Sequence, residues 1–205
     1  GALFDLEKVK SISKEVLGNM NKDDFAQAAL DYAQNYNKEL YDLIVSDPDY
    51  FKEIINIERD QEKPRKDYEK FSDVLPIINF MYDEYFDQLS KEIQFNQRFD
   101  QNLLIDLLEE YRDSFTLDVD QETWFNQMKE IAVGRNFAKR AKDYQKTPEN
   151  YIGHIGEYAE IIRIATCAKT STPNFYDVLR ILGKDKIVAR INHTIALLKN
   201  WYIDV

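Results

Sequence analysis

The stretch DPDYFKEII, residues 47–55, shows most directly how this chain folds. It opens with Asp47 and Pro48, a typical helix start, because an Asp side chain accepts hydrogen bonds from unpaired backbone N–H groups and Pro is tolerated at the first helical position. The aromatic and aliphatic residues that follow are spaced three and four apart, so they share one helix face. The stretch therefore predicts a helix with one buried face.

Apolar residues recur at the same helical spacing on both sides of this stretch. The expected helices are 9–20, 21–43, 47–55, 72–86, 103–111, 120–131, 153–168, 172–183 and 187–198. Asn21, Ser72, Asp120 and Thr172 are the residues expected to cap helices, and Gly183 is expected to end one. Val and Thr are scarce and no segment alternates with a period of two, so strands are not expected. The sequence predicts an all-α protein.

The expected helices group into three parts of the chain. We expect a linker helix over 1–20, a first helical subdomain over 21–115 and a second over 116–205, with the boundary in the polar connector 113–120. The segment 58–70 is dense in charge and poor in apolar residues, so it is expected to be a loop. A length of 205 residues suits one large or two small domains.

The composition excludes several classes of protein. The single cysteine, Cys167, excludes an internal disulfide bond and a cysteine-rich zinc site, and it fits the reducing cytoplasm. No apolar run approaches the length of a membrane span and no signal peptide opens the chain, so a cytoplasmic location without membrane contact is expected. Because residue 1 is Gly and not Met, we expect a fragment of a longer protein.

Charge is distributed unevenly along the chain. Residues 1–128 contain 14 Lys and Arg against 29 Asp and Glu, whereas residues 129–205 contain 13 against 8. The net charge of −10 argues against nonspecific binding to DNA, because both partners would be polyanions. Only the C-terminal third offers a surface suited to phosphates, and an ordinary solvated helical surface is the alternative.

The sequence lacks the motifs of common catalytic and metal sites. It has two histidines, His154 and His193, and neither a His-Glu-x-x-His motif nor a glycine-rich phosphate loop. His154 and Glu157 have a spacing that a metal or proton-transfer site can use, but no nucleophile or second His accompanies them. A capping or packing role is the alternative for this pair, and Cys167 is interpreted as a small buried hydrophobe. No catalytic residue or metal site is expected.

Several stretches, taken in order, resemble a known family. They are LFDLEKV (3–9), KPRKD (63–67), KFSDV (70–74), GHIGE (153–157), IRIA (162–165), TPNFYDVL (172–179) and LGKDKIVARI (182–191). In this order they resemble the C-terminal anticodon-binding region of glutamyl-tRNA synthetases, which are class I aminoacyl-tRNA synthetases. The chain departs from the family at Phe71, where the family has Trp, and at Cys167-Ala168, where it has a Thr-Gly pair.

The resemblance implies a function for the chain. It implies a helical bundle, or cage, that binds the anticodon of tRNA(Glu), while a catalytic domain elsewhere in the full-length protein ligates glutamate to the tRNA with ATP and magnesium. The segment by itself is then expected to hold no cofactor and to catalyse no aminoacylation. A monomer is expected, and acceptance of the tRNA for glutamine stays open.

The resemblance also implies which residues read the anticodon. In the family, the residues that match Arg163, Thr172, Pro173 and Phe175 lie against the anticodon bases. These residue types suit that role, because Arg offers a planar fork of donors, a helix start offers unpaired N–H groups and an aromatic ring offers a stacking face. The structural alternatives are an ion pair for Arg163, a plain helix start for Thr172 and Pro173, and the core for Phe175.

Basic residues from two segments are candidate contacts to the tRNA backbone. They are Arg65, Lys66, Arg135, Lys139, Arg140 and Lys142. Local ion pairs or a solvated surface are the alternatives for these residues. The alternative function, from another class, is an acidic all-α protein-interaction scaffold. Burial of Phe175, together with pairing of Arg163 to an acid, would favour that scaffold.

Overall fold

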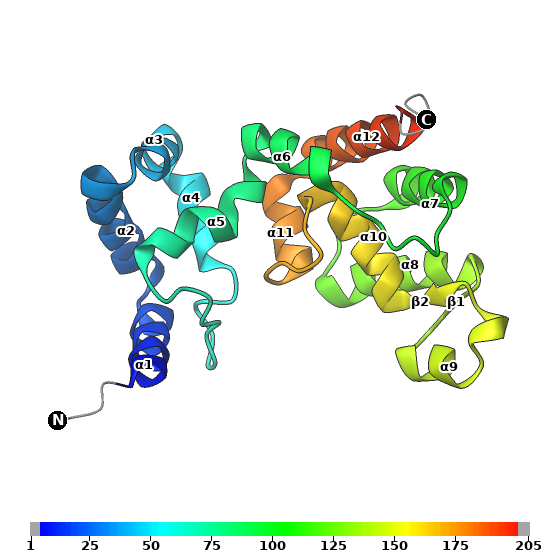
Figure 1. Cartoon of the computed structure of the whole chain (residues 1–205), viewed down its shortest axis with the longest axis horizontal. Coiled ribbons are helices and arrows are strands. Elements are labelled where there is room, and N and C mark those ends of the chain that lie inside the picture. The colour runs from blue at the N-terminus through cyan, green and yellow to red at the C-terminus, as the bar shows by residue number, and fades with distance from the viewer. Residues whose placement is uncertain (1–4, 201–205) are drawn as a thin grey trace. The chain divides into compact units, whose positions relative to one another are not determined.

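Helices form almost all of the regular structure in the computed structural model, which describes residues 5–200 (Figure 1). The α-helices are α1 (Leu6–Asn19), α2 (Lys22–Tyr36), α3 (Lys38–Ser46), α4 (Pro48–Asn56), α5 (Val74–Ile78), α6 (Asp83–Leu89), α7 (Gln101–Ser114), α8 (Gln121–Gly134), α9 (Ala141–Lys146), α10 (Ile155–Cys167), α11 (Phe175–Leu182) and α12 (Lys184–Asn200). The 3-10 turns are η1 (Phe71–Asp73), η2 (Asn79–Met81), η3 (Ser90–Glu92) and η4 (Pro148–Asn150), and the strands are β1 (Phe137–Ala138) and β2 (Gly153–His154). The predicted all-α fold class is confirmed.

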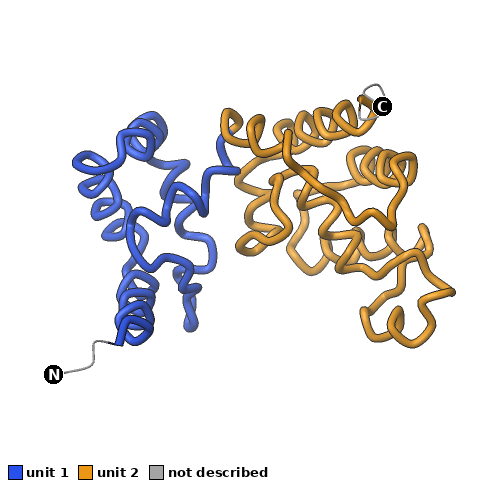
Figure 2. The backbone as a smooth tube through the Cα atoms, in the orientation of Figure 1, with its two compact units in different colours: residues 1–82 blue, residues 83–205 orange. Residues whose placement is uncertain are grey.

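The chain divides into two compact units, residues 1–82 and residues 83–205, which Figure 2 colours separately. Helix α1, expected to be a linker, belongs to the first unit, where the Ser13 hydroxyl donates to the Glu69 carbonyl and Lys14 pairs with the Glu69 carboxylate at 3.1 Å. The boundary expected at 113–120 lies inside the second unit instead, because α7 packs on both α10 and α12.

The first unit is built on the packing of α2, α3 and α4. In α4 the Asp47 side chain accepts from the Tyr50 N–H at 3.0 Å, and Phe51 is fully buried, as the 47–55 pattern predicts. Buried Arg59 then donates to the Leu17 carbonyl at 2.7 Å and lies over the Phe25 ring at 4.0 Å. The end of α1 is thereby fastened to the core of this unit.

Two predicted helices of the N-terminal half are broken into pieces. The helix expected over 21–43 stops at Asn37, because the Asn37 side chain accepts from the Leu40 N–H at 3.0 Å and so starts α3. The helix expected over 72–86 becomes η1, α5, η2 and α6, because Tyr82 has an extended backbone. The predicted cap at Ser72 is wrong, since Ser72 lies inside η1 and the Asp73 carboxylate binds the N–H groups that precede it.

Helix α10 is the central element of the second unit. It packs against α7, α8 and α12, and its residues Tyr158, Ile162 and Cys167 have no exposed surface. The buried position of Cys167 confirms its interpretation as a small hydrophobe. Gly183, with φ of 78°, ends α11 as predicted.

Two short strands, which the sequence analysis did not expect, precede α10. β1 pairs with β2 in parallel, with Phe137 opposite Gly153. A side chain at Gly153 would clash with the Phe137 ring, which lies 2.9 Å from the place of its Cβ. Each strand has only two residues, so neither produces a period-two pattern. Across residues 5–200, no helix is both long enough and apolar enough to cross a membrane.

Candidate nucleic-acid interface

A reciprocal cap fixes the start of α10, the helix that carries Arg163. The His154 ring accepts from the Gly156 N–H through Nδ1 at 3.1 Å, and the Glu157 carboxylate accepts from the His154 N–H at 3.0 Å. Glu157 also forms an ion pair with Arg98. The spacing of His154 and Glu157 is therefore explained by helix capping.

The loop after α10 begins with a left-handed residue. Ala168 has φ of 52° and ψ of 31°, and its N–H donates to the Ile164 carbonyl at 2.9 Å as the helix ends. This conformation favours Gly, the residue that the resemblance places here. The turn directs the loop 168–174 so that the Thr170 carbonyl lies within reach of the Arg163 side chain.

Arg163 is a half-buried cation that forms no ion pair with any of residues 5–200. It donates from Nη1 to the Thr170 carbonyl at 3.3 Å, and its guanidinium carbon lies 4.6 Å from the centre of the Phe175 ring. Its Nε–H is buried and meets no hydrogen-bond acceptor among the described residues, and burial lowers the pKa of the guanidinium below its ordinary value. The Nη1 end of the guanidinium, whose bond to the Thr170 carbonyl is exposed, is the part that an acceptor from outside the chain can reach.

Phe175 lies in the core and does not offer a free stacking face. It is 8% exposed, and its ring meets the Trp124 ring edge-on with centroids 5.8 Å apart. Arg163 lies over the Phe175 ring. The core alternative for Phe175 is therefore the one that the structure shows, whereas the ion-pair alternative for Arg163 is absent from residues 5–200.

Helix α11 starts later than predicted. Thr172 does not cap it, because its hydroxyl donates to the Pro173 carbonyl at 2.9 Å and the cap is Asn174, whose side chain accepts from the Asp177 N–H at 3.2 Å. Packing of Phe175 on α8 fixes the first helical residue one position after this strong capping residue. Thr172 and Pro173 are thus half-buried residues of the loop.

Gln121, at the start of α8, is a neighbour of this loop that the sequence analysis missed. Its side-chain oxygen accepts from the Asn174 amide at 3.2 Å. Asn174 carries a recognisable signal, since Asn directly before an apolar helical run is a typical cap. Gln121 carries none, because it is 53 residues away in the sequence and only the tertiary fold brings it to Asn174.

The candidate backbone contacts of the second unit differ in their ion pairs. Arg135 pairs with Glu110, and Arg140 pairs with Asp143 through two hydrogen bonds of 2.8 and 2.9 Å. Lys139 is exposed and has no ion pair with any described residue. The same is true of Lys142 and of Lys146, which lies in the same run of sequence. These three lysines are therefore available to phosphates.

The candidate contacts of the first unit form local ion pairs. Arg65 pairs with Glu58 at 3.1 Å and with Asp67, and Lys66 pairs with Glu15. The pair of Lys66 is exposed and therefore weak, so it does not prevent contact with a phosphate, whereas the pairs of Arg65 are half-buried. The structure thus shows the ion-pair alternative for both residues.

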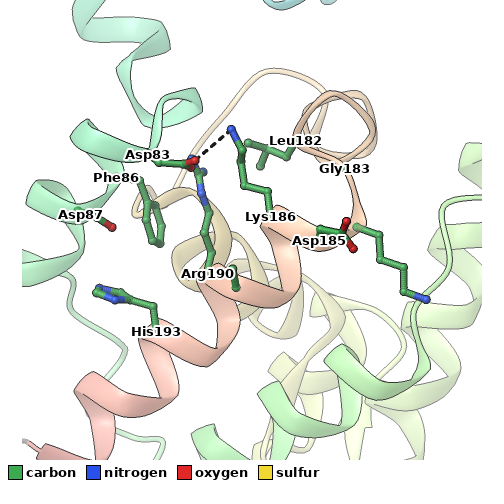
Figure 3. A pocket seen from close by; sticks show the side chains of 11 residues that line it. Asp83, Phe86, Asp87, Leu182, Gly183, Asp185, Lys186, Arg190 and His193 are labelled. Carbon is green, nitrogen blue, oxygen red and sulfur yellow. Dashed lines mark hydrogen bonds and ion pairs between the residues drawn. The ribbon is translucent and has the colours of Figure 1, made fainter.

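A cavity of about 700 Å³ lies elsewhere in the second unit, between α6 and the start of α12 (Figure 3). Three of its charged groups are engaged with one another: Asp83 meets Lys186 at 3.2 Å and Arg190 at 2.8 Å. The His193 Nε2 lies 2.9 Å from the Ser90 hydroxyl. None of the predicted site residues lines this cavity.

Comparison with known proteins identifies the class of domain. Residues 136–195, which include Arg163 and the loop 168–174, match the family of anticodon binding domains. The second unit of this chain therefore carries an anticodon-binding domain.

Related proteins show similarity beyond these matched residues. It is 32% identical over 198 residues to the glutamate–tRNA ligase of Clostridium perfringens, covering 96% of this chain and 36% of that protein. The glutamate–tRNA ligase of Acetivibrio thermocellus is 32% identical over 93% of this chain, and that of Sorangium cellulosum 33% over 93%. The chain is thus similar along almost its whole length to part of the glutamate–tRNA ligases. It spans about a third of the length of these relatives, 36%, 34% and 33% respectively.

Proposed function

We propose that this chain binds the anticodon loop of tRNA(Glu) and thereby selects the tRNA for a glutamate–tRNA ligase. An anticodon-binding domain implies tRNA as the partner. The names of the related proteins support glutamate as the amino acid and tRNA(Glu) as the cognate tRNA. Ligation itself, with ATP and magnesium, is proposed for a catalytic domain in the full-length protein.

The unpaired Arg163 is the observation that supports this function most strongly. An anticodon is a single-stranded loop whose base edges carry hydrogen-bond acceptors. The Thr170 carbonyl and the Phe175 ring fix the orientation of the Arg163 guanidinium, and its Nη1 end is exposed. The acceptor of a base edge or a phosphate would bind this exposed end, and a base without an acceptor there would leave a donor unpaired on binding.

The domain contributes through differential binding. A good polar contact to a base discriminates by about 1–3 kcal/mol, judged by contacts to DNA bases. The three unpaired lysines, Lys139, Lys142 and Lys146, would add affinity that is independent of the base sequence and falls with salt. A tRNA with the correct anticodon would thus stay bound longer than one with an incorrect anticodon, although both make the same phosphate contacts.

A binding titration tests this function. The chain is titrated against an RNA hairpin with the anticodon arm of tRNA(Glu) and against a copy with a substituted anticodon, at two salt concentrations. We expect binding in the micromolar range or weaker, at least fivefold tighter for the native anticodon, with the preference lost in Arg163→Ala. Arg112→Ala is the matched control, because Arg112 bonds Asp113 and Asn192 outside the site.

Two results would count against the proposal. Equal binding to both hairpins that disappears at high salt would reduce the role of the chain to phosphate contact. No binding to either hairpin, also with the full-length protein, would favour the acidic protein-interaction scaffold.

A further inference from the structure

The buried position of Phe175 leaves the interface without the stacking face that single-stranded RNA recognition uses. Another aromatic residue of the second unit is exposed. Phe125, on α8, has 41% of its surface accessible, and among residues 83–200 no other large apolar side chain is comparably exposed. It lies outside the part of the chain that matches the anticodon-binding family.

Phe125 lies on the helical turn that contacts the loop before α11. It follows Gln121, which is bonded to Asn174, by four residues, and residues four apart are neighbours on a helix surface. It also directly follows Trp124, whose ring packs on Phe175. The start of α8 can be seen beside this loop in Figure 1.

The groups around Phe125 favour a base over a phosphate. The neutral amides of Gln121 and Asn174 are hydrogen-bonded to each other between α8 and the loop. On the same helix Glu122 precedes Phe125 by three residues and Lys129 follows it by four, so their opposite charges offset and give a phosphate no net attraction, whereas the face of a neutral base needs none. An exposed aromatic ring beside neutral donors and acceptors is suited to an unstacked base.

We propose that Phe125 stacks on an unpaired base of the anticodon loop, beside the base that Arg163 contacts. This inference rests on the proposed function. The stacking face that the sequence pattern suggested for Phe175 is thus supplied from a different helix. Phe125 provides affinity and Arg163 provides base choice, because every base has a stacking face but only some present an acceptor.

The test compares two exposed aromatic residues in titrations with the anticodon-arm hairpin. Phe125→Ala is expected to weaken binding by about 5- to 150-fold, the range that loss of one stacked base produces. Phe125→Trp, which keeps an aromatic stacking face, is expected to bind the hairpin with about wild-type affinity. Tyr36→Ala is the matched control, because Tyr36 is 78% exposed and belongs to the first unit, so wild-type affinity is expected. Circular dichroism checks that each variant is folded.

A second arm identifies the contact as stacking. Hairpins that lack one anticodon-loop base at a time are titrated against wild type and Phe125→Ala. At one position the loss of the base and the loss of the ring are expected to be non-additive, because either change removes the same contact.

The outcomes separate the inference from the proposed function. Wild-type affinity in Phe125→Ala, while Arg163→Ala still loses the anticodon preference, would overturn the stacking role alone. A defect that is equal for every abasic hairpin would also overturn it. Failure of the wild type to bind any hairpin would overturn both proposals.

Discussion

Ala168 has a backbone conformation that its side chain disfavours. Its φ of 52° is in the left-handed region, where a Cβ atom costs about 1–2 kcal/mol and Gly is the usual residue. The family that the sequence resembles has Gly at this position, so Cys167-Ala168 is a departure with a measurable cost.

Ala168→Gly is therefore expected to stabilise the protein by about 0.5–1 kcal/mol. The gain is smaller than the full strain, because Gly also increases the conformational freedom of the unfolded chain. Urea denaturation measures the free energy of unfolding. Ala165→Gly, inside α10, is the control and is expected to destabilise by about 1 kcal/mol. A loss of stability in Ala168→Gly would show that the left-handed turn carries no strain.

Cys167 is expected to be unreactive in the folded protein. Burial raises the pKa of its thiol to about 11, and the side chain has no exposed surface. Because the thiol pKa is raised in the folded state, that state holds the thiol proton more tightly than the unfolded chain does. The stability that comes from this proton is complete below pH 9 and is lost as the pH rises toward 11. A disulfide reagent at pH 8 should label the thiol only at the rate of unfolding. Rapid labelling without denaturant would contradict this expectation.

Arg190 of α12 joins that helix to α10 and α6. It is 3% exposed, donates to the Thr166 carbonyl of α10 at 2.8 Å and pairs with Asp83 of α6 at 2.8 Å. Its guanidinium also lies over the Phe86 ring at 4.3 Å. Removing Arg190 would delete a buried side chain and its buried hydrogen bond to the Thr166 carbonyl, which costs several kcal/mol, whereas exposed ion pairs contribute little.

Arg190→Ala is expected to lower the free energy of unfolding by about 3 kcal/mol. The control is Lys199→Ala on the same helix, whose exposed pair with Glu109 at 3.7 Å should contribute less than about 0.5 kcal/mol. Denaturation curves of both variants measure the difference. Equal small effects would mean that α12 is held by its apolar face alone.

The pH dependence of this contact follows from Asp83. Burial acts to raise the pKa of its carboxyl, but the hydrogen bonds and charges of Arg190 and Lys186 together outweigh burial and hold the pKa below 3.8. The ionised Asp83 carboxylate stabilises the fold at every pH above the ordinary pKa of the group. This stabilisation is lost as the pH falls through the lowered pKa. Asp83→Asn should therefore be less stable than wild type at pH 7, and the gap should close at the acidic end. A constant gap would contradict the assignment.

The helix boundaries show which features of the fold the sequence pattern could predict and which it could not. The helix over 47–55 and the stop at Gly183 follow from neighbouring residues and were predicted. The start of α11 was misplaced because Thr172-Pro173 and Asn174 are both local helix-start signals, and Asn174 is the residue that caps the helix, by accepting from the Asp177 N–H. The helix expected over 72–86 is broken where Tyr82 has an extended backbone, which apolar periodicity does not register.

On the scale of the whole molecule, ion pairs reduce the basic surface that the charge asymmetry predicts. Arg135 pairs with Glu110, Lys199 with Glu109 and Arg190 with Asp83, so acids of the N-terminal part of the chain neutralise cations of the C-terminal third. The lysines of the run 139–146 remain without ion pairs in the described part of the chain. The salt dependence of tRNA binding should therefore be modest.

Replacing Lys139, Lys142 and Lys146 by Ala is expected to reduce the slope of log affinity against log salt by about 2–3, because each lysine that neutralises a phosphate contributes about 0.7–0.9. The preference for the native anticodon should persist, since phosphate contacts carry no base choice. Titrations of both hairpins at several salt concentrations measure the slope and the preference together.

A charge-matched triple variant controls for the change in net charge. Replacement of Lys8, Lys22 and Lys63, which are exposed in the first unit, should leave the slope almost unchanged. An equal reduction of the slope in both variants would mean that affinity depends only on the net charge of the protein, and that the run 139–146 does not contact the phosphates.

The sequence by itself determined what depends on near neighbours. Helix class, most helix positions, the cap at Asp47 and the stop at Gly183 follow from spacing and capping within a few residues. Tertiary structure alone decided which side chains are accessible. It buried Phe175, left Arg163 without an anion, exposed Phe125 beside the loop and placed the unit boundary after Tyr82. The physical reason is that burial and pairing are set by residues far apart in the chain, which periodicity cannot register.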